Sequence, residues 1–320
     1  MGADGGHARV APVTAADRAA ALLEDVLGEP RMLADLLDAY AAPGGPMAAL
    51  AEMPASRRIV FTGLGSSRYG ALDAATALRG AGRTAWVEFA SADQATPPAR
   101  DVVLVAISAS GSTPETVAGA ERHRGKSLVV AVTNRPESPL ATAADVVLPL
   151  FAGMETSGVS SRTFLATTTV LALLAGRSVD ALRPAVEGLE RLIAERAEWL
   201  PPAADLLDGA DSIGVLGQAG SQGLAEQAAL LLREGPRLRA TAHEATDWLH
   251  TAIYTALPGY RAVLLPGIED ADGLERVITK RGGAVVRTPP IMGPARLVLP
   301  AFADVLAAHL WAHAGAPARS

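Results

Sequence analysis

The sequence predicts an α/β protein built from two similar units, each a parallel sheet with helices on both faces in a Rossmann-like αβα sandwich. Three observations lead to this prediction. The chain has 320 residues, which is more than one hydrophobic core usually serves. Short apolar runs alternate with helical segments, as in parallel sheets. The pattern that begins near Ile59 begins again near Ile213.

The first unit is predicted to contain five strands with helices between them. The expected strands are residues 59–62, 84–89, 102–107, 127–133 and 146–150. The expected helices are residues 68–80, 114–124, 163–175 and 182–200. Before this unit, residues 15–41 have helical periodicity that is interrupted at Gly28-Glu29-Pro30.

An internal repeat defines the second unit. Residues 59–73 and 213–227 both read as a strand, a glycine-containing loop and an alanine-rich helix, at a constant offset of 154 residues. A further strand expected at residues 261–265 takes the place that residues 103–107 have in the first unit. The matching pairs are Ile59 with Ile213, Gly63 with Gly217, Ser67 with Ser221 and Arg79 with Arg233. This order of elements predicts a duplicated α/β unit.

The composition argues against several classes of partner and cofactor. The net charge is −6 and aromatic residues make up 4% of the chain, so nucleic acid and anionic membranes are not expected partners. Without cysteine there is no disulfide, thiolate metal site or cysteine nucleophile. His309 and His313 have metal-chelating spacing but lack an evident third ligand. We therefore expect no metal and no cofactor.

The sequence also favours the cytoplasm. The first residues, MGADGGHARV, contain no apolar segment of the kind found in signal peptides. The apolar stretch at residues 163–176 is rich in threonine and alanine and too short to span a bilayer. We expect a cytoplasmic protein in which that stretch is a buried helix.

A loop rich in hydroxyl groups is the strongest functional signal. It follows an apolar strand and comprises Ser108, Ala109, Ser110, Gly111, Ser112 and Thr113. Thr113 suits a helix N-cap and Pro114 the first helical position. Free backbone N–H groups and the positive end of a helix dipole favour phosphate. The alternative is an ordinary strand-to-helix turn; the density of hydroxyls favours a phosphate site.

Two other loops follow predicted strands, and neither has the same density of hydroxyl groups. The corresponding loop of the second unit, residues 266–272, contains three acidic residues and would repel phosphate. The loop at residues 63–67 partly matches a dinucleotide fingerprint, with Glu88 placed to hold a ribose, but Arg68 stands where the third glycine is required. We expect Ser66 and Ser67 to contact a sugar or phosphate instead.

These residues together resemble the double-SIS (sugar isomerase) domain family. The similar members are the isomerase domain of glutamine–fructose-6-phosphate aminotransferase and stand-alone glucosamine-6-phosphate deaminases. The matching segments are Glu29-Pro30 and residues 63–67, 108–116, 152–155, 160–164, 231–234 and 247–250. The resemblance implies that Glu234 moves a proton between C1 and C2, that His250 opens the sugar ring from the other subunit, and that Ser160 contacts the sugar.

The resemblance further implies two tandem SIS units in a homodimer with a shared active site. The expected divisions are an N-terminal helical segment at residues 1–50, a phosphate-binding unit at 51–200 and a unit carrying Glu234 and His250 at 201–320. The favoured reaction converts glucosamine 6-phosphate to fructose 6-phosphate and ammonia, without a glutaminase domain or cofactor. A fructosamine-phosphate deglycase, a specialised biosynthetic isomerase and a non-catalytic sensor are the alternatives.

Several positions depart from the family pattern. Leu231 and Arg162 stand where the family has lysines, and Gln227 replaces an acidic residue. Glu234 could be a surface charge at a helix end, and His250 a surface imidazole, with His243 competing for its role. Glu234 and His250 are sixteen residues apart, as in the family pattern, and they lie in the second copy of the duplicated α/β unit. Both facts favour the catalytic interpretation.

Overall fold

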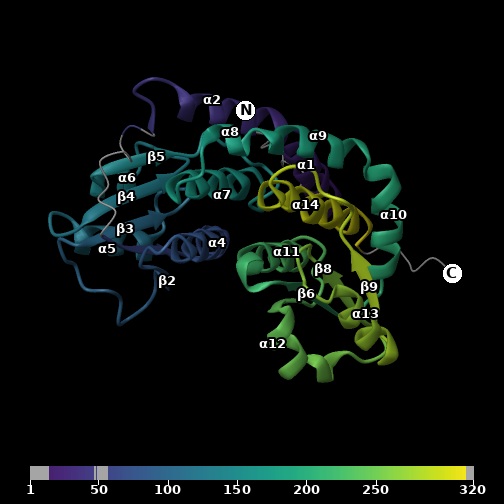
Figure 1. Ribbon diagram of the computed structural model, residues 1–320. Coiled ribbons are helices and arrows are strands. Elements are labelled where there is room, and N and C mark those ends of the chain that lie inside the picture. The colour runs from purple at the N-terminus through teal and green to yellow at the C-terminus, as the bar shows by residue number, and fades with distance from the viewer. Residues whose placement is uncertain (1–13, 47, 49–56, 315–320) are drawn as a thin grey trace, which may run out of the picture.

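The computed structural model describes residues 14–46, 48 and 57–314. It contains two parallel sheets that lie side by side, with helices packed around and between them (Figure 1). The predicted α/β class with two sheet-based units is therefore confirmed. Residues 1–13 and 49–56, which belong to the expected N-terminal segment and the start of the first unit, lie outside the described residues.

The first sheet has five parallel strands in the order β2-β1-β3-β4-β5. The strands are β1 (Arg58–Gly63), β2 (Ala85–Phe89), β3 (Val102–Ile107), β4 (Leu128–Thr133) and β5 (Val146–Pro149). The intervening helices are α4 (Ser66–Gly80), α5 (Pro114–His123) and α6 (Pro139–Ala143), and α7 (Arg162–Leu174) follows the sheet. All five predicted strands are present. Strands β1, β3 and β4 are buried apolar runs, whereas β2 and β5 lie at the edges of the sheet and are mostly half-buried. The short helix α6 was not predicted.

The second sheet has four parallel strands in the order β7-β6-β8-β9. The strands are β6 (Ser212–Gly217), β7 (Ala240–Glu244), β8 (Tyr260–Leu264) and β9 (Ala284–Arg287). The helical segments are η1 (Ala219–Ser221), α11 (Gln222–Glu234), α12 (Ala245–His250), η2 (Ile253–Thr255) and α13 (Ala271–Lys280). Strands β6 and β8 were predicted. Strand β7 is polar and β9 is short, so neither shows a clear apolar run.

The two sheets share one connectivity. In each, the first strand lies between the second and third strands of its unit. Gly63 ends β1 and Gly217 ends β6, which are positions paired by the repeat. The duplicated strand–loop–helix pattern is thus present in both units.

Among the residues that the structure describes, further helices flank and join the sheets. They are α1 (Ala15–Leu27), α2 (Glu29–Ala41), α8 (Val179–Leu182), α9 (Pro184–Ala194), α10 (Arg196–Leu207) and α14 (Ala295–His313). The interruption predicted at Gly28 separates α1 from α2. The single helix predicted at residues 182–200 is wrong, because Pro184 begins a new helix and Glu195 separates α9 from α10. The expected division after residue 200 falls inside α10 and stays a prediction.

Helix α14 lies at the centre of the molecule. It packs against α1, α7, α9 and α11, and Figure 1 shows it between the two sheets. This helix of 19 residues is long and apolar enough to span a membrane. However, 78% of its apolar stretch is buried inside the protein, as in the core helix of a globular protein. One continuous hydrophobic core includes Phe61, Val215 and Phe302.

Candidate functional site

The hydroxyl-rich loop leaves the first sheet at the end of β3. Ser108 is only 3% exposed, and its Oγ lies 2.9 Å from Thr113 Oγ1 and accepts from the N–H of Gly111 at 3.1 Å. Thr113 precedes α5, as predicted, but its hydroxyl contacts Ser108 and does not cap the helix. The N-terminus of α5 therefore has no side-chain cap, and the exposed Ser110 lies beside it.

Gly111 allows the loop to close against helix α6. Its φ is +63°, and an added Cβ would lie 2.0 Å from Ser138 Oγ, which no side chain tolerates. The Gly111 carbonyl accepts a hydrogen bond from the N–H of Leu140 at 3.0 Å. The loop is thus fixed in position by its own backbone.

Ser66 and Ser67 begin helix α4 at the neighbouring strand end. A Cβ on Gly63 would lie 3.1 Å from the Ile107 carbonyl oxygen, so the end of β1 approaches the residue that leads into the hydroxyl-rich loop. Both serines are half-buried. The structure therefore places Ser66 and Ser67 next to the loop, and their contact with a sugar or phosphate stays a prediction.

Arg68 follows these serines and lies over an aromatic ring. Its guanidinium carbon is 3.9 Å from the ring centroid of Phe89. The neighbouring Glu88 is occupied by Trp86 Nε1 at 2.9 Å and by the N–H of Thr96 at 3.0 Å. Because Trp86 and Thr96 already bind the Glu88 carboxylate, Glu88 has a structural role at the end of β2, which argues against the dinucleotide alternative.

Ser160 is brought to the same region by helix packing. It lies two residues before α7, and α7 packs against α4. A Cβ on Gly70, in the second turn of α4, would lie 3.2 Å from Thr167 Cγ2, so the first turns of α4 and α7 lie close together. Ser160 Oγ is 2.6 Å from Thr163 Oγ1.

Asn134 joins the hydroxyl-rich loop to the segment that leads to Ser160. Its N–H donates to the Ala109 carbonyl at 3.1 Å. Its side-chain oxygen accepts from the N–H of Ala152 at 3.0 Å, and its Nδ2 donates to the Gly153 carbonyl at 2.6 Å. Sequence analysis missed Asn134, although its position directly after a buried parallel strand is a signal of the kind used for Ser108.

Glu234 is the last residue of α11 and is exposed. Partial burial raises the pKa of its carboxyl, while Arg233 and Arg237 act to lower it. The side chain of Gln227, two turns earlier in α11, donates from Nε2 to the Ser160 carbonyl at 2.7 Å. Seven residues of helix span about 10 Å. Along the axis of α11, Glu234 therefore lies about 10 Å from Gln227, the residue that contacts Ser160.

His250 is exposed at the end of α12, in the second unit. Figure 1 shows α12, which ends at His250, well separated from α5 and β3, the elements on either side of the hydroxyl-rich loop. The competing His243 is half-buried, with Nε2 3.0 Å from Thr241 Oγ1. Burial lowers the pKa of His243.

A set of buried carboxyl groups lies around the start of α7, and sequence analysis did not recognise it. Glu155 accepts from the N–H of Ser161 at 2.7 Å and Ser161 Oγ donates to Glu29 at 2.8 Å. Asp25 pairs with Arg162 at 2.6 Å. Burial raises the pKa of Glu29 to about 8. Only the match of Glu29 and Glu155 to the family pattern could have indicated this cluster.

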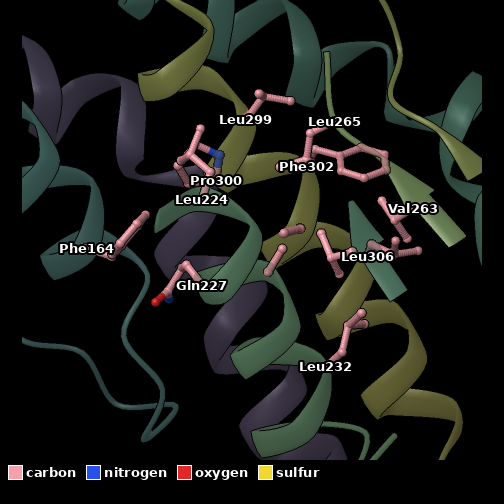
Figure 2. Close-up of a pocket in the computed structure, with 13 residues that line it drawn as sticks. Phe164, Leu224, Gln227, Leu232, Val263, Leu265, Leu299, Pro300, Phe302 and Leu306 are labelled. Atoms are coloured by element: carbon pink, nitrogen blue, oxygen red, sulfur yellow. The ribbon is translucent and has the colours of Figure 1, made fainter. Parts of the chain in front are cut away.

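A small enclosed cavity lies behind Gln227. It measures about 20 Å³ and lies between α7, α11, α14 and the second sheet. Figure 2 shows that its lining is apolar except for Gln227. The volume suits one water molecule and is far below that of a small-molecule site. Within the part of the chain that the structure describes, no group of three potential metal ligands is found.

Comparison with known proteins agrees with this arrangement. A family model described as the SIS domain matches residues 52–177, the segment that holds the first sheet, the hydroxyl-rich loop and Ser160. Residues 52–177 form an SIS domain. Its phosphate-loop candidate, Ser108–Thr113, lies between the third strand and the helix that follows it.

A curated relative extends the similarity beyond this SIS domain. The glutamine–fructose-6-phosphate aminotransferase (isomerizing) of Aeropyrum pernix is 29% identical over 290 residues, covering 84% of this chain and 47% of that protein. The chain thus spans about half the length of this relative.

Two solved structures share the fold of the whole chain. Tagatose-6-phosphate ketose/aldose isomerase from Escherichia coli has a TM-score of 0.76 at 16% identity, covering 95% of this chain and 96% of that one. Glucosamine-6-phosphate deaminase from Thermotoga maritima has a TM-score of 0.70 at 17% identity, covering 92% and 95%. The second sheet is therefore part of a fold that these two proteins share over nearly their whole length.

Proposed function

We propose that this chain is a sugar-phosphate isomerase or deaminase, and that glucosamine 6-phosphate is its favoured substrate. The observation that carries the proposal is the loop of Ser108–Thr113, which lies between a buried parallel strand and the uncapped N-terminus of α5. The similarity to an isomerizing aminotransferase, an isomerase and a deaminase supports the same class of substrate.

The phosphate group is proposed to bind without a lysine. Hydroxyl groups, backbone N–H groups and the positive end of a helix dipole can together bind an oxyanion. The proposed phosphate contacts are Ser108, Ser110, Thr113 and the backbone at Ala109. Ser66, Ser67 and Ser160 would then contact the sugar, because their segments adjoin this loop.

Glu234 is proposed as the base. It would remove the proton from C2 of the open-chain amino sugar and return a proton to C1, by way of an enolamine. The resulting imine at C2 takes up water and releases ammonia, which leaves fructose 6-phosphate. A carboxyl group whose pKa is raised by partial burial is suited to such proton transfer.

His250 is proposed to open the sugar ring in the site of a second copy of the chain. An imidazole suits proton transfer near neutral pH. His250 is exposed and lies beside the exposed apolar residues Leu249 (39% exposed), Tyr254 (74%) and Leu257 (59%). A homodimer that covers this surface would bring His250 to the partner's site, and we propose that assembly.

A coupled assay tests the proposal. Purified protein is given glucosamine 6-phosphate, and ammonia and fructose 6-phosphate are measured together. We expect equal amounts of both products, and Glu234→Gln should abolish them while Glu226→Gln, on the same helix, should not. Fructose 6-phosphate binding without either product would direct the search to fructosamine phosphates or unusual sugar phosphates.

One observation favours a second candidate, a phosphosugar-binding protein without turnover. Leu231, where related enzymes have a lysine, is 1% exposed and belongs to the hydrophobic core. This position therefore cannot supply a cation near Glu234. Calorimetry that detects sugar-phosphate binding, together with no turnover of any sugar phosphate tried, would support this candidate.

A further inference from the structure

The hydroxyl group of Thr163 lies between an acid and the proposed sugar-binding serine. Thr163 Oγ1 is 2.6 Å from Glu155 Oε2 and 2.6 Å from Ser160 Oγ. A hydroxyl has one hydrogen, and an ionised carboxylate only accepts. With Glu155 ionised, the hydrogen of Thr163 must therefore point to Glu155. Thr163 can then only accept from Ser160.

Glu155 is held in place by the backbone at the start of α7. Its Oε1 accepts from the N–H of Ser161 at 2.7 Å and from the N–H of Thr163 at 3.2 Å. Burial raises the pKa of Glu155, whereas these hydrogen bonds lower it. The two backbone N–H groups bind Oε1, so in the ionised carboxylate Oε2 accepts the hydrogen of the Thr163 hydroxyl.

Ser160 is fixed from both units of the chain. Its carbonyl accepts from Gln227 Nε2 at 2.7 Å, and its hydroxyl hydrogen is directed to Thr163. The Ser160 side chain is half-buried, and its remaining lone pair is available to a ligand. With Glu155 ionised and the bond to Thr163 kept, Ser160 Oγ can therefore accept a hydrogen bond from a ligand but has no hydrogen left to donate.

The hydroxyl-rich loop has no such constraint. Ser108, Ser110, Ser112 and Thr113 contact one another or backbone N–H groups. No carboxylate fixes the direction of these hydroxyls in the part of the chain that the structure describes, and either partner of the Ser108–Thr113 contact can donate, so the loop can turn hydrogens toward an oxyanion. A phosphate, which only accepts when fully ionised, fits these hydroxyls and is disfavoured at Ser160. The two parts of the site thus differ in what they can bind.

We propose that Glu155 and Thr163 are positioning residues that hold Ser160 as a hydrogen-bond acceptor for a sugar hydroxyl. This inference rests on the proposed function, and it deepens that function by assigning each end of the substrate. The phosphate lies at Ser108–Thr113, and a hydroxyl of the sugar donates to Ser160 Oγ.

Glu155→Gln provides the sharpest test. The amide can keep its oxygen toward the two backbone N–H groups and turn Nε2 to donate to Thr163, which reverses the hydroxyl chain and removes the acceptor at Ser160. We expect calorimetry near pH 8 to show about tenfold weaker binding of fructose 6-phosphate. Binding of inorganic phosphate should change by less than about twofold, because the loop of Ser108–Thr113 is unaltered.

Thermal unfolding separates positioning from structure. The substitution removes a buried negative charge close to Glu29 and Asp304, so we expect Glu155→Gln to keep or raise the Tm while it weakens sugar-phosphate binding. Thr163→Val should weaken fructose 6-phosphate binding similarly, and Thr163→Ser should restore it. Thr169→Val is the matched control, because the Thr169 hydroxyl donates only to the Leu165 carbonyl in the same helix.

The outcomes distinguish this inference from the proposed function. If the wild-type chain binds fructose 6-phosphate and Glu155→Gln binds it equally well, the inference is wrong and the proposed function stands. Equal loss of fructose 6-phosphate and inorganic phosphate also overturns it, because the residues would then support the site as a whole. If the wild-type chain binds neither probe, the proposed function fails and the inference with it.

Discussion

Asp73 of α4 accepts a hydrogen bond from the backbone N–H of Gly223 in α11, with 3.0 Å between Asp73 Oδ1 and Gly223 N. The residues are 150 positions apart in the chain and belong to different sheet-based units. Asp73 is 4% exposed. A side chain of the first unit thus binds a free N–H at the start of a helix in the second unit.

We predict that Asp73 makes the stability of the protein fall with rising pH. Burial raises the pKa of Asp73 from 3.8 to about 6, while Arg296 and the Gly223 N–H lower it. The native protein therefore holds this proton more tightly than the unfolded chain. The resulting stabilisation is complete below about pH 4 and is lost by about pH 6, on the order of 3 kcal/mol.

Urea unfolding between pH 4 and pH 7 checks this prediction. Asp73→Asn can still accept from Gly223 but does not titrate, so the free energy of unfolding of this variant should fall less with pH than that of the wild type. Asp205→Asn, at an exposed position of α10, is the control and should behave as the wild type. Parallel pH curves for wild type and Asp73→Asn would contradict the assignment.

Gly223→Ala should force α4 and α11 apart. A Cβ at Gly223 would lie 2.1 Å from the Tyr69 carbonyl oxygen and 3.0 Å from Asp73 Oδ1. We expect the free energy of unfolding to fall by about 1–3 kcal/mol or more. Gly119→Ala in α5 is the control, since nothing lies within 4 Å of its added Cβ and a gain of about 0.5–1 kcal/mol is expected. If Gly223→Ala and Gly119→Ala changed the free energy of unfolding in urea equally, the close contact between α4 and α11 would be contradicted.

Asp304→Asn should raise stability most at high pH. Asp304 is 1% exposed, and neither of its carboxyl oxygens has a hydrogen-bond partner among residues 14–46, 48 and 57–314. Burial and the nearby Glu29 raise the pKa of Asp304 well above its usual range, and burial raises that of Glu29 from 4.5 to about 8. Both carboxyl groups ionise more readily in the unfolded chain than in the native protein. The free energy of unfolding therefore falls as the pH rises from about 4.5 to about 8.

Thermal unfolding at pH 5 and pH 8 checks the prediction for Asp304. The variant carries no charge at this position, so the gain in Tm over the wild type should be larger at pH 8 than at pH 5. The wild-type Tm should itself be lower at pH 8. A gain that is the same at both pH values would show that packing, and not charge, determines the effect.

Ser110→Ala combined with Thr113→Ala should weaken sugar-phosphate binding by ~2–4 kcal/mol, because charge-assisted hydrogen bonds contribute about 1.5–3 kcal/mol each and add incompletely. Calorimetry with fructose 6-phosphate measures the loss. Thr279→Ala, at an exposed position of the second unit, should bind as the wild type does. Unchanged affinity in the double variant would place the phosphate elsewhere.

Mixing two inactive variants tests whether the site is shared. Glu234→Gln and His250→Ala chains, exchanged at equal amounts, should regain about a quarter of the wild-type activity. Half of the dimers would be mixed, and one of the two sites in each would contain both wild-type side chains. No recovery after subunit exchange has been demonstrated by mass spectrometry would contradict a His250 supplied by the partner.

The first sheet and its loop were predictable from the sequence because buried parallel strands are continuous apolar runs. The run Val102–Ile107 followed by hydroxyl residues identified both a strand and a candidate site. The second sheet was harder to predict. Strand β7 begins at Ala240 and includes His243 and Glu244, so its burial depends on its neighbours and not on its own composition.

The sequence by itself determined the strands of the first sheet and two strands of the second, where the repeat lies and which loop is rich in hydroxyls, since these depend on residues that are close in the chain. Only the tertiary structure decided that Ser161 binds Glu29 across 132 positions and that Asp73 binds Gly223 across 150. It also placed the Thr163 hydroxyl between Glu155 and Ser160. Such contacts depend on how separate helices pack, and burial in that packing is what changes the pKa of their carboxyl groups.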